Sequence, residues 1–572
     1  MIQIAYNAVD ARILNAPKDV LLEIHRLLSY KVQGSEHMAA FQSGNWGGRS
    51  SFFTFDKAHF PAGFVELVSR GVRAMGHEVQ MVSKPRPVPL GPLRPEVDAF
   101  GYTDRYNYQP ETVDKLVQHG MMIAQVATGG GKSRICRMAY KRIDRPTLFL
   151  TTRGILMHQM RDAVVAMGEE VAVLGDGEWG IKYTRADGSP GRRISKFCVG
   201  MVQTLSQKLE VLTVEGELQS LAQRRATAMA KKVQECRAAC QKAKMLPHLI
   251  GTEVNKVCTA LTAALPSPKL DRTQIEEKVA KHERLRVGTL KFLKRFELVI
   301  AEEAHEVSGT GFYTVMAACK NAHYRLALTA TPFMKDDEEA NMQLLASCGG
   351  IGIRVSEELL INRGILARPY FKFLKLDEAR KPKKLFRSTP WQKAYPEGIV
   401  NNEYRNKLMC AEVVRAVRYG LNALMLVQYK AHGAILRDML NSYGLQAEFI
   451  DGDSDQAERQ RCLNRLARGD LDALIGSTIL DVGVDVPSIG MIVLAGGGKA
   501  EVSLRQRIGR GLREKKGRSN VALIVDVYDE FNNHLREHSA ERQAIIKSTP
   551  GFMENIVRDF DYVALGLERK AA

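Results

Sequence analysis

Short apolar segments alternate with amphipathic segments along most of this chain. Beyond residue 100 the apolar segments are four to six residues long, as at 121–126 and 147–151, and stretches with helical spacing follow them. Apolar runs of this length, bounded by polar turns and separated by helices, are typical of buried parallel strands. The pattern therefore predicts an α/β protein.

Two groups of these strands predict two lobes, each built on a parallel sheet. Lobe 1 is expected over 100–350, with further strands at 197–202, 297–301 and 324–328. Lobe 2 is expected over 403–550, with strands at 423–427, 447–450, 473–476, 491–495 and 521–525. Residues 351–402 are expected to form a solvated connector between the lobes, and residues 551–572 a C-terminal tail.

Residues 1–83 have a different pattern, which predicts a small α+β domain. Helical spacing at 17–30 and 64–75 flanks a strand-like segment at 51–55. Trp46 and Arg49 lie beside glycines, where a ring and a guanidinium are suited to a nucleic-acid backbone. A structural hairpin with a core tryptophan is the alternative. The basic, proline-rich segment 84–99 is expected to be an extended linker.

Residues 206–295 interrupt the alternation of strand and helix. Residues 217–244 contain no Gly or Pro, and helical spacing continues at 250–264 and 273–294. These features predict a helical insertion in lobe 1, resembling a coiled-coil hairpin. Two interpretations stay open: a solvated decoration, and a device that grips or separates nucleic-acid strands.

The segment VATGGGKS at 126–133 lies between a predicted strand and a predicted helix. This arrangement predicts a phosphate-binding loop, because glycines allow the backbone to approach an anion and the helix N-terminus directs N–H groups at it. Lys132 would reach the β- and γ-phosphates of ATP, and Ser133 would hold Mg²⁺. The predicted loop contacts are Thr128, Gly129, Gly130, Gly131, Lys132 and Ser133. A glycine-rich turn that binds nothing is the alternative.

Further polar residues stand where they complete a nucleotide site. Gln109 has an amide that fits an adenine edge. Glu302 and Glu303 end the strand 297–301, where Glu302 would hold Mg²⁺ through water and Glu303 would activate the attacking water. Residues expected to couple this site to the second lobe and to sense the γ-phosphate are His305, Thr329 and Thr331.

Polar residues just past other strand ends are expected to contact a nucleic-acid backbone, since open α/β sheets bind ligands at that edge. They are Thr152, Arg153, Gln203, Thr204 and Thr478. Lobe 2 has no second phosphate loop but offers GVDVP at 483–487 and QRIGRGLR at 506–513. Arg510 and Arg513 share a helix face and are candidate arginine fingers. Asp485 is assigned to the nucleotide site and Gln506 to catalysis; a basic surface helix is the alternative.

Composition adds a charged partner to this picture. The 572 residues carry a formal net charge of +18 with a pI near 9.4, which favours a polyanion such as nucleic acid over simple solubility as the explanation. No apolar run is long enough to span a membrane, and the first residues lack the features of a secretion signal. Nine scattered cysteines favour a reducing cytoplasm, and Cys236 and Cys240 do not have a standard zinc spacing.

Taken in order, these motifs resemble the motor of superfamily 2 helicases. They are Gln109, ATGGGKS, TTRGIL, QTL, EEAH, LTATP, STILDVGVDVP and QRIGRGLR. SGNWGGR, FPAGF and the strand end DVYDEF also resemble UvsW-type phage helicases. The resemblance implies two RecA-like lobes and a viral, ATP- and Mg²⁺-dependent enzyme that remodels branched DNA in recombination and repair. It also implies 3′-to-5′ movement, possible action on RNA–DNA hybrids, and the host cytoplasm as the location.

Two residues depart from the family pattern. Val126 replaces the usual small first residue of the loop, and Glu302 stands where the family usually has Asp. We expect activity to survive, because a ligand that acts through water tolerates an extra methylene. The predicted function is therefore a DNA-stimulated ATPase and helicase; the sequence leaves the oligomeric state open, and a monomer is favoured. The alternatives are a duplex translocase that does not separate strands and a non-enzymatic junction-binding protein.

Overall fold

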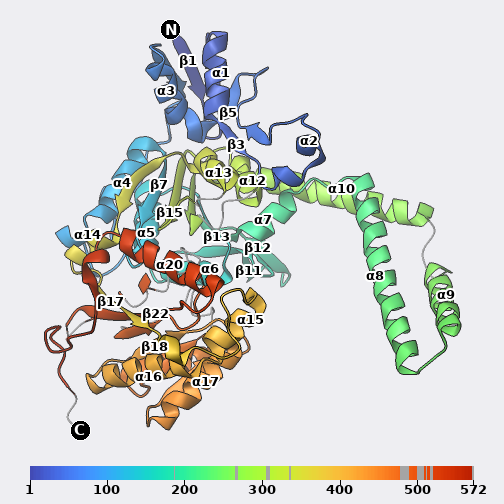
Figure 1. The fold of residues 1–572 in the computed structure, drawn as a ribbon. Coiled ribbons are helices and arrows are strands. Elements are labelled where there is room, and N and C mark those ends of the chain that lie inside the picture. The colour runs from blue at the N-terminus through green and yellow to red at the C-terminus, as the bar shows by residue number, and fades with distance from the viewer. Residues whose placement is uncertain are drawn as a thin grey trace.

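The computed structural model describes residues 1–185, 187–263, 268–304, 310–333, 337–476, 489–498, 508–509, 512–515 and 519–569. It shows an N-terminal domain, two lobes and a helical arm that projects from lobe 1 (Figure 1). Each lobe is a predominantly parallel sheet covered by helices. The predicted fold class is confirmed.

The N-terminal domain is a four-stranded sheet with two longer helices, α1 and α3, and the short helix α2 Ala39–Gln42. Its strand order is β5-β2-β1-β6, and β3 pairs with β4 beside it. The bounds are β1 Ile2–Tyr6, β2 Asp10–Leu14, α1 Lys18–Leu27, β3 Ser29–Lys31, β4 Arg49–Ser51, β5 His59–Pro61, α3 Val65–Ala74 and β6 Val79–Ser83. The domain packs directly on lobe 1, since a Cβ at Gly63 would lie 2.1 Å from the carbonyl oxygen of Leu345.

Lobe 1 is an eight-stranded sheet with the order β10-β9-β13-β8-β14-β15-β7-β16. Its strands are β7 Met121–Val126, β8 Thr147–Thr151, β9 Val171–Gly175, β10 Glu178–Trp179, β13 Phe197–Met201, β14 Leu298–Glu302, β15 Tyr324–Thr329 and β16 Ile351–Val355. Its helices are α4 Tyr108–His119, α5 Lys132–Ile143, α6 Gly154–Val165, α7 Val202–Leu209, α12 Thr310–Ala318, α13 Glu338–Cys348 and α14 Glu357–Asn362. A hairpin of β11 Ile181–Thr184 and β12 Pro190–Arg193 extends from the β10 edge.

The predicted insertion consists of three helices rather than one hairpin. They are α8 Val214–Lys242, α9 Pro247–Ala263 and α10 Pro268–Leu293, and together they form the arm in Figure 1. Intermediate exposure recurs on α8 at Leu218, Leu221, Met229 and Val233. This spacing places them on one face of the helix, as expected for packing against neighbouring helices.

Lobe 2 is a seven-stranded parallel sheet with the order β19-β20-β18-β21-β22-β17-β23. Its strands are β17 Arg368–Lys375, β18 Ala423–Leu426, β19 Ala447–Ile450, β20 Ala473–Gly476, β21 Met491–Val493, β22 Val521–Tyr528 and β23 Ile556–Val557. Its helices are α15 Trp391–Tyr395, α16 Glu403–Arg418, α17 Lys430–Ser442, α18 Gln456–Arg468 and α20 Asn533–Ser548.

Two strands lie in the segment 351–402, which the sequence presents as a solvated connector. β16 pairs with β7 in lobe 1, and β17 pairs with β22 in lobe 2. The β17 sequence RPYFKFLK contains a proline and three cations, so it does not resemble a buried strand. Its Lys372 is nevertheless buried, because its ammonium forms ion pairs with Glu412 at 2.8 Å and Asp559 at 2.7 Å.

The covalent and membrane features of the described residues are simple. All nine cysteines are free thiols, and six of them are buried with apolar neighbours in the two lobes. Within the described ranges we find no helix with the length and apolar character needed to cross a bilayer.

Candidate functional site

The phosphate loop connects β7 to α5 and depends on its glycines. Gly129 and Gly131 have φ angles of 86° and 79°, a region that strains other residues. A Cβ at Gly130 would lie 2.6 Å from the side chain of Val126, and one at Gly131 would lie 2.4 Å from the amide of Gln109. The unusual Val126 is therefore accommodated as a buried strand residue, and the adjacent turn has room only for glycine.

Gln109 contacts this loop from α4. Its Nε2 donates to the carbonyl oxygen of Gly130 at 3.2 Å, and its Oε1 accepts from Arg134 at 2.7 Å. Tyr108 donates to the same carbonyl at 2.8 Å. Gln109 is 2% exposed, so in this structure its side chain supports the loop. Direct recognition of adenine by Gln109 stays a prediction.

The predicted carboxylates lie beside the loop lysine. Lys132 Nζ is 3.2 Å from Glu303 Oε1, and Lys132 is almost fully buried. Burial and the neighbouring charge of Glu303 raise the pKa of Glu302 to about 7, while Lys132 opposes the shift. Glu303 has a φ of 50°, a conformation that non-glycine residues adopt mainly where surrounding structure imposes it. The structure thus brings Lys132, Glu302 and Glu303 together.

The oxygen donors here fit a magnesium ion. Ser133 is the second residue of α5, and Glu302 ends β14 two strands from β7. Hydroxyl and carboxylate oxygens are the ligand types that Mg²⁺ takes in nucleotide sites, usually with several waters retained. A cation would also favour the ionised form of Glu302, whose burial disfavours that charge. Ser133 and Glu302 stay predicted ligands.

The predicted coupling threonines lie between the loop and the carboxylates. β15 pairs with β14 on one side and with β7 on the other. At its end, the backbone N–H of Thr331 donates to the hydroxyl of Thr329 at 3.2 Å, and Gln125 donates to the carbonyl of Ala330 at 3.3 Å. A movement at this strand end would therefore be felt by both neighbours.

Lobe 2 approaches the same loop. A Cβ at Gly509 would lie 2.8 Å from the Cβ of Thr128, and a Cβ at Gly129 would lie 2.7 Å from the side chain of Leu366. Arg513 forms a β-bridge with Leu366, and burial lowers the pKa of its guanidinium. The described part of the predicted finger segment therefore lies against the phosphate loop. Five predicted residues lie outside the described ranges: His305, Thr478, Asp485, Gln506 and Arg510.

The predicted nucleic-acid contacts of lobe 1 also gather at one place. Gln203 Nε2 donates to the carbonyl of Thr152 at 3.3 Å, because β13 and β8 are adjacent. Arg153 follows Thr152, and Thr204 follows Gln203 at the start of α7. Four strand spacings separate β13 from β7, or about 19 Å at roughly 4.8 Å each. The two predicted sites share one sheet edge without overlapping.

Trp46 and Arg49 have structural partners in the N-terminal domain. Trp46 Nε1 donates to the carbonyl of Arg49 at 2.7 Å. The Arg49 guanidinium donates to Ser29 O and to Glu338 of α13, each at 3.2 Å. This pair joins the domain to lobe 1 while Arg49 stays about half exposed. Its contact with nucleic acid stays a prediction.

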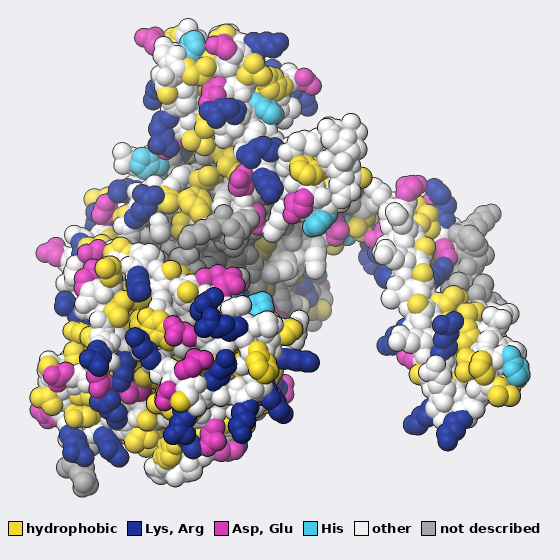
Figure 2. Space-filling view, viewed as in Figure 1, with side chains coloured by type: hydrophobic (Ala, Val, Ile, Leu, Met, Phe, Trp, Pro, Cys, Tyr) yellow, Lys and Arg dark blue, Asp and Glu magenta, His cyan; other side chains and the backbone are white. Residues whose placement is uncertain are grey.

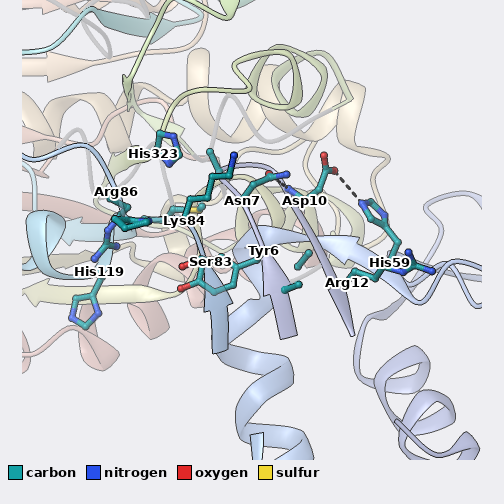
Figure 3. A pocket seen from close by; sticks show the side chains of 15 residues that line it. Tyr6, Asn7, Asp10, Arg12, His59, Ser83, Lys84, Arg86, His119 and His323 are labelled. Atoms are coloured by element: carbon teal, nitrogen blue, oxygen red, sulfur yellow. Dashed lines mark hydrogen bonds and ion pairs between the residues drawn. The ribbon is translucent and has the colours of Figure 1, made fainter. Parts of the chain in front are cut away.

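Sequence analysis did not predict a hollow of about 680 Å³ between the N-terminal domain and lobe 1 (Figure 3). Lys84, Arg86, His119 and His323 line it, and burial lowers the pKa of His323. His119 and His323 precede β7 and β15, so the hollow lies at the amino edge of the sheet, opposite the phosphate loop. It forms between segments far apart in the sequence, which no local pattern reveals.

Two family models match the chain. "Type III restriction enzyme, res subunit" matches residues 103–334, and "Helicase conserved C-terminal domain" matches residues 405–515. The first covers the phosphate loop, the two carboxylates and the threonines of β15. The second covers Arg405 to Lys515, including the segment that lies against the loop.

Individual relatives match over parts of their length. Helicase 22 of Sulfolobus islandicus filamentous virus is 22% identical over 44% of this chain and 46% of its own. The DNA 3′-5′ translocase XPB2 of Sulfurisphaera tokodaii is 28% identical over 41% of this chain and 58% of its own. In both, the matched stretch is less than two thirds of the relative. The crystal structure of T4 UvsW aligns over 97% of this chain and 98% of that one, with 16% identity and a TM-score of 0.40.

Proposed function

We propose that this chain is a superfamily 2 helicase, a DNA-stimulated ATPase that translocates on DNA and remodels branched DNA. One observation carries the proposal. Lys132, Glu302 at the end of β14 and the adjacent Glu303 converge at one end of the lobe 1 sheet, and Gly509 of lobe 2 lies against the same loop. A nucleotide bound there would contact both lobes.

Each residue has a role that follows from its position. Lys132 would neutralise charge on the β- and γ-phosphates, and Glu303 would orient and deprotonate the attacking water. Mg²⁺, when bound by Ser133 and Glu302, would neutralise the remaining phosphate charge. Arg510 and Arg513 would stabilise the charge of the transferring group, an effect that reaches roughly 10³–10⁵ in rate. Asp485 and Gln506 would complete the lobe 2 side.

Movement along DNA would follow from the shared sheet edge. Closure of the lobes on ATP and opening after hydrolysis change the distance between strand contacts on lobe 1 and Thr478 on lobe 2. Thr329 and Thr331, with His305, would transmit the loss of the γ-phosphate. The lobe 1 contacts Thr152, Arg153, Gln203 and Thr204 would hold the strand while lobe 2 moves. The names of two relatives, DNA 3′-5′ translocase XPB2 and the DNA 3′-5′ helicase Rad25 of Halobacterium salinarum, support 3′-to-5′ polarity.

The test is ATP hydrolysis with and without DNA. We expect DNA to stimulate phosphate release, and Lys132→Ala to abolish turnover while DNA binding persists. Lys115→Ala, which replaces a half-buried α4 lysine paired with Glu111, is the matched control and should behave as the parent. Turnover retained in Lys132→Ala would refute the nucleotide site, and a parent protein without ATPase would favour a non-enzymatic junction binder.

A second candidate is movement on duplex DNA without strand separation, favoured by the word translocase in the name of XPB2. Strand-displacement and triplex-displacement assays on one preparation separate the two activities. Holliday junctions, forks, displacement loops and RNA–DNA hybrids should be compared in the same assay, because the preferred branched substrate defines the biological task. The free thiols and the cationic surface support a reducing compartment with access to nucleic acid, and we propose the cytoplasm.

A further inference from the structure

The arm formed by residues 213–293 stands away from the rest of the molecule. α8 has 29 residues and is therefore about 43 Å long at 1.5 Å per residue. Figure 1 shows α8 starting beside α10 and extending away from it with α9, and Figure 2 shows open space between this outer part and the two lobes. A projecting element of this length favours a binding role over a solvated decoration.

The arm is built to hold its shape. Arg225 of α8 forms a bidentate ion pair with Asp271 of α10, with one N–O distance of 2.9 Å, and Lys278 of α10 pairs with Glu217 of α8 at 2.6 Å. At the base, the Phe292 ring lies 5.5 Å from Trp179 of β10, and Lys208 of α7 stacks on Trp179 at 4.5 Å. These contacts fix the arm to lobe 1.

The outer part of the arm is strongly cationic. Residues 224–256 contain eight Lys or Arg and two Glu, an excess of six. That is one third of the formal charge of +18 in 33 of the 572 residues. Charge dispersed over the surface would be enough to keep the protein soluble. A cluster of positive charge of this size therefore indicates a polyanionic partner.

Several of these cations have no counter-charge within the arm. Arg225, Lys232 and Lys256 pair with Asp271, Glu235 and Glu253. Exposed cations that form no ion pair with another described residue are Lys231, Arg237, Lys242 and Lys244. Lys231 and Lys242 are eleven residues apart and so share one line along the helix, about 16 Å in length. They form a row that phosphates can approach.

The composition of the arm identifies which form of nucleic acid fits. Residues 210–291 contain no Phe, Trp or Tyr. Proteins that bind single strands stack bases on aromatic rings, whereas duplex DNA presents only backbone and groove edges to a basic surface. Cations without aromatic residues therefore suit the phosphodiester backbone of a duplex.

We propose that the arm is a clamp for duplex DNA, and that its unpaired cations bind the phosphate backbone of the duplex next to the strand held by the motor. This proposal rests on the proposed function, because that function supplies the DNA strand held by the motor. Its geometry follows from α7, which begins with the predicted contacts Gln203 and Thr204 and packs against α10. The base of the arm thus adjoins the predicted strand path, and its outer part reaches beyond it.

The test replaces the four unpaired cations together, as Lys231→Gln, Arg237→Gln, Lys242→Gln and Lys244→Gln. The matched control removes four exposed cations of the segment between the lobes, as Lys375→Gln, Lys383→Gln, Lys384→Gln and Arg387→Gln. Binding is measured by fluorescence anisotropy with a 30-base-pair blunt duplex and with an oligo(dT) strand, over a salt series. Circular dichroism confirms that both variants keep their helix content.

We expect the arm variant to bind duplex about tenfold or more weakly, with the slope of log K against log salt reduced by about three to four. Its oligo(dT) binding and its oligo(dT)-stimulated ATPase should match the parent, and strand displacement on forked DNA should fall. Parent-like duplex binding, equal losses for duplex and oligo(dT), or an equal loss in the control variant would each overturn the clamp. Because the duplex assay needs no ATP, an inactive motor would refute the proposed function without changing this result.

Discussion

Both lobes place carboxylates at the end of a central strand, and the surroundings of those carboxylates differ. In lobe 1, Glu302 and Glu303 end β14 and share Lys132, and burial raises the pKa of Glu302 to about 7. In lobe 2, Asp526 lies near the end of β22 and Asp529 directly follows that strand, and each is bound by a buried arginine. Arg542 Nε lies 2.9 Å from Asp526, and Arg405 Nε lies 2.7 Å from Asp529.

The difference shows what each pair of acids is for. Two arginines neutralise two aspartates in lobe 2, and Arg405 also donates to the carbonyl of Ala495 at 2.7 Å, so these charges stabilise the fold. Among the described residues of lobe 1, Lys132 pairs with Glu303 and only partly offsets the raised pKa of Glu302, and a bound metal ion would favour the ionised form of that carboxylate. Substitutions should therefore affect turnover in lobe 1 and stability in lobe 2.

The largest effect is expected for Glu303→Gln. Loss of the proposed base should lower kcat for ATP by about 10²–10⁴. The free energy of unfolding should stay within about 1 kcal/mol of the parent, because the substitution removes a charge that opposes ionisation of Glu302 as well as a partner of Lys132. Steady-state ATPase and urea denaturation of the same sample measure both.

Glu111→Gln on α4 is the control for Glu303→Gln, since Glu111 is exposed and its ion pair within the described part of the chain is with Lys115. It should leave both quantities unchanged. A Glu303→Gln protein that turns over ATP normally but unfolds easily would reverse the contrast between the lobes.

The lobe 1 site was open to prediction because its parts are local. Each strand of the site is an apolar run that can be recognised in the sequence, and a motif stands at its end: VATGGGKS, EEAH or LTATP. Parallel strands bring these ends to one edge of the sheet. The contact between Gly509 and Thr128 depends on how the two lobes pack against each other. No local sequence pattern predicts that packing, and here only the family resemblance indicated it. The sequence was therefore sufficient to predict the fold class and the edge of the lobe 1 sheet that carries the candidate site.

The lobe 2 ion pairs were not accessible, for a physical reason. Arg405 lies 124 residues before Asp529, and a sequence gives no sign that this arginine is buried. β17 was hidden in the same way, because its lysine is neutralised by partners 40 and 187 residues away. Buried charge contradicts the hydrophobic pattern by which strands are recognised, so only the fold reveals it.

The next largest effect is expected for Arg405→Leu. It leaves Asp529 buried without its guanidinium, and removal of one partner of a buried pair costs about 3–5 kcal/mol. Urea denaturation should show the loss, and Arg405→Lys should lose less because the charge persists.

The control for Arg405→Leu is Arg415→Leu on the same helix. Arg415 is 41% exposed in its pair with Asp559, and exposed pairs contribute about 0–1 kcal/mol. Equal losses for Arg405→Leu and Arg415→Leu would show that burial does not govern the contribution of lobe 2 charges.

A smaller effect is expected from pH, through His432 in the lobe 2 core. Burial, with Arg405 nearby, lowers the pKa of His432 to about 3, and its Nε2 lies 3.0 Å from Asn406 Oδ1. The native state keeps His432 neutral, while the unfolded chain protonates it below about pH 6.5, so acidification favours unfolding. At pH 5 this costs about 2 kcal/mol relative to pH 7. His432→Gln should unfold with a shallower pH dependence between pH 7 and 5, and an identical slope would remove His432 as the cause.

The smallest effect divides lobe 1 itself. Arg153 follows β8, which lies three strand spacings from β7, so this predicted strand contact is about 14 Å from the phosphate loop at roughly 4.8 Å per strand. Arg153→Ala should weaken oligo(dT) binding several-fold and reduce the salt slope by about 0.7, the value for one phosphate contact on a single strand. ATP hydrolysis without DNA should be unchanged, because the loop and both carboxylates keep their partners. Arg161→Ala on the same helix, where Arg161 pairs with the adjacent Asp162, is the control and should bind as the parent. If Arg153→Ala instead lowered ATP hydrolysis in the absence of DNA, the nucleotide site and the predicted DNA contacts of this sheet edge would form one site. The comparison between the carboxylates of lobe 1 and the ion-paired aspartates of lobe 2 would then have to include the DNA contacts.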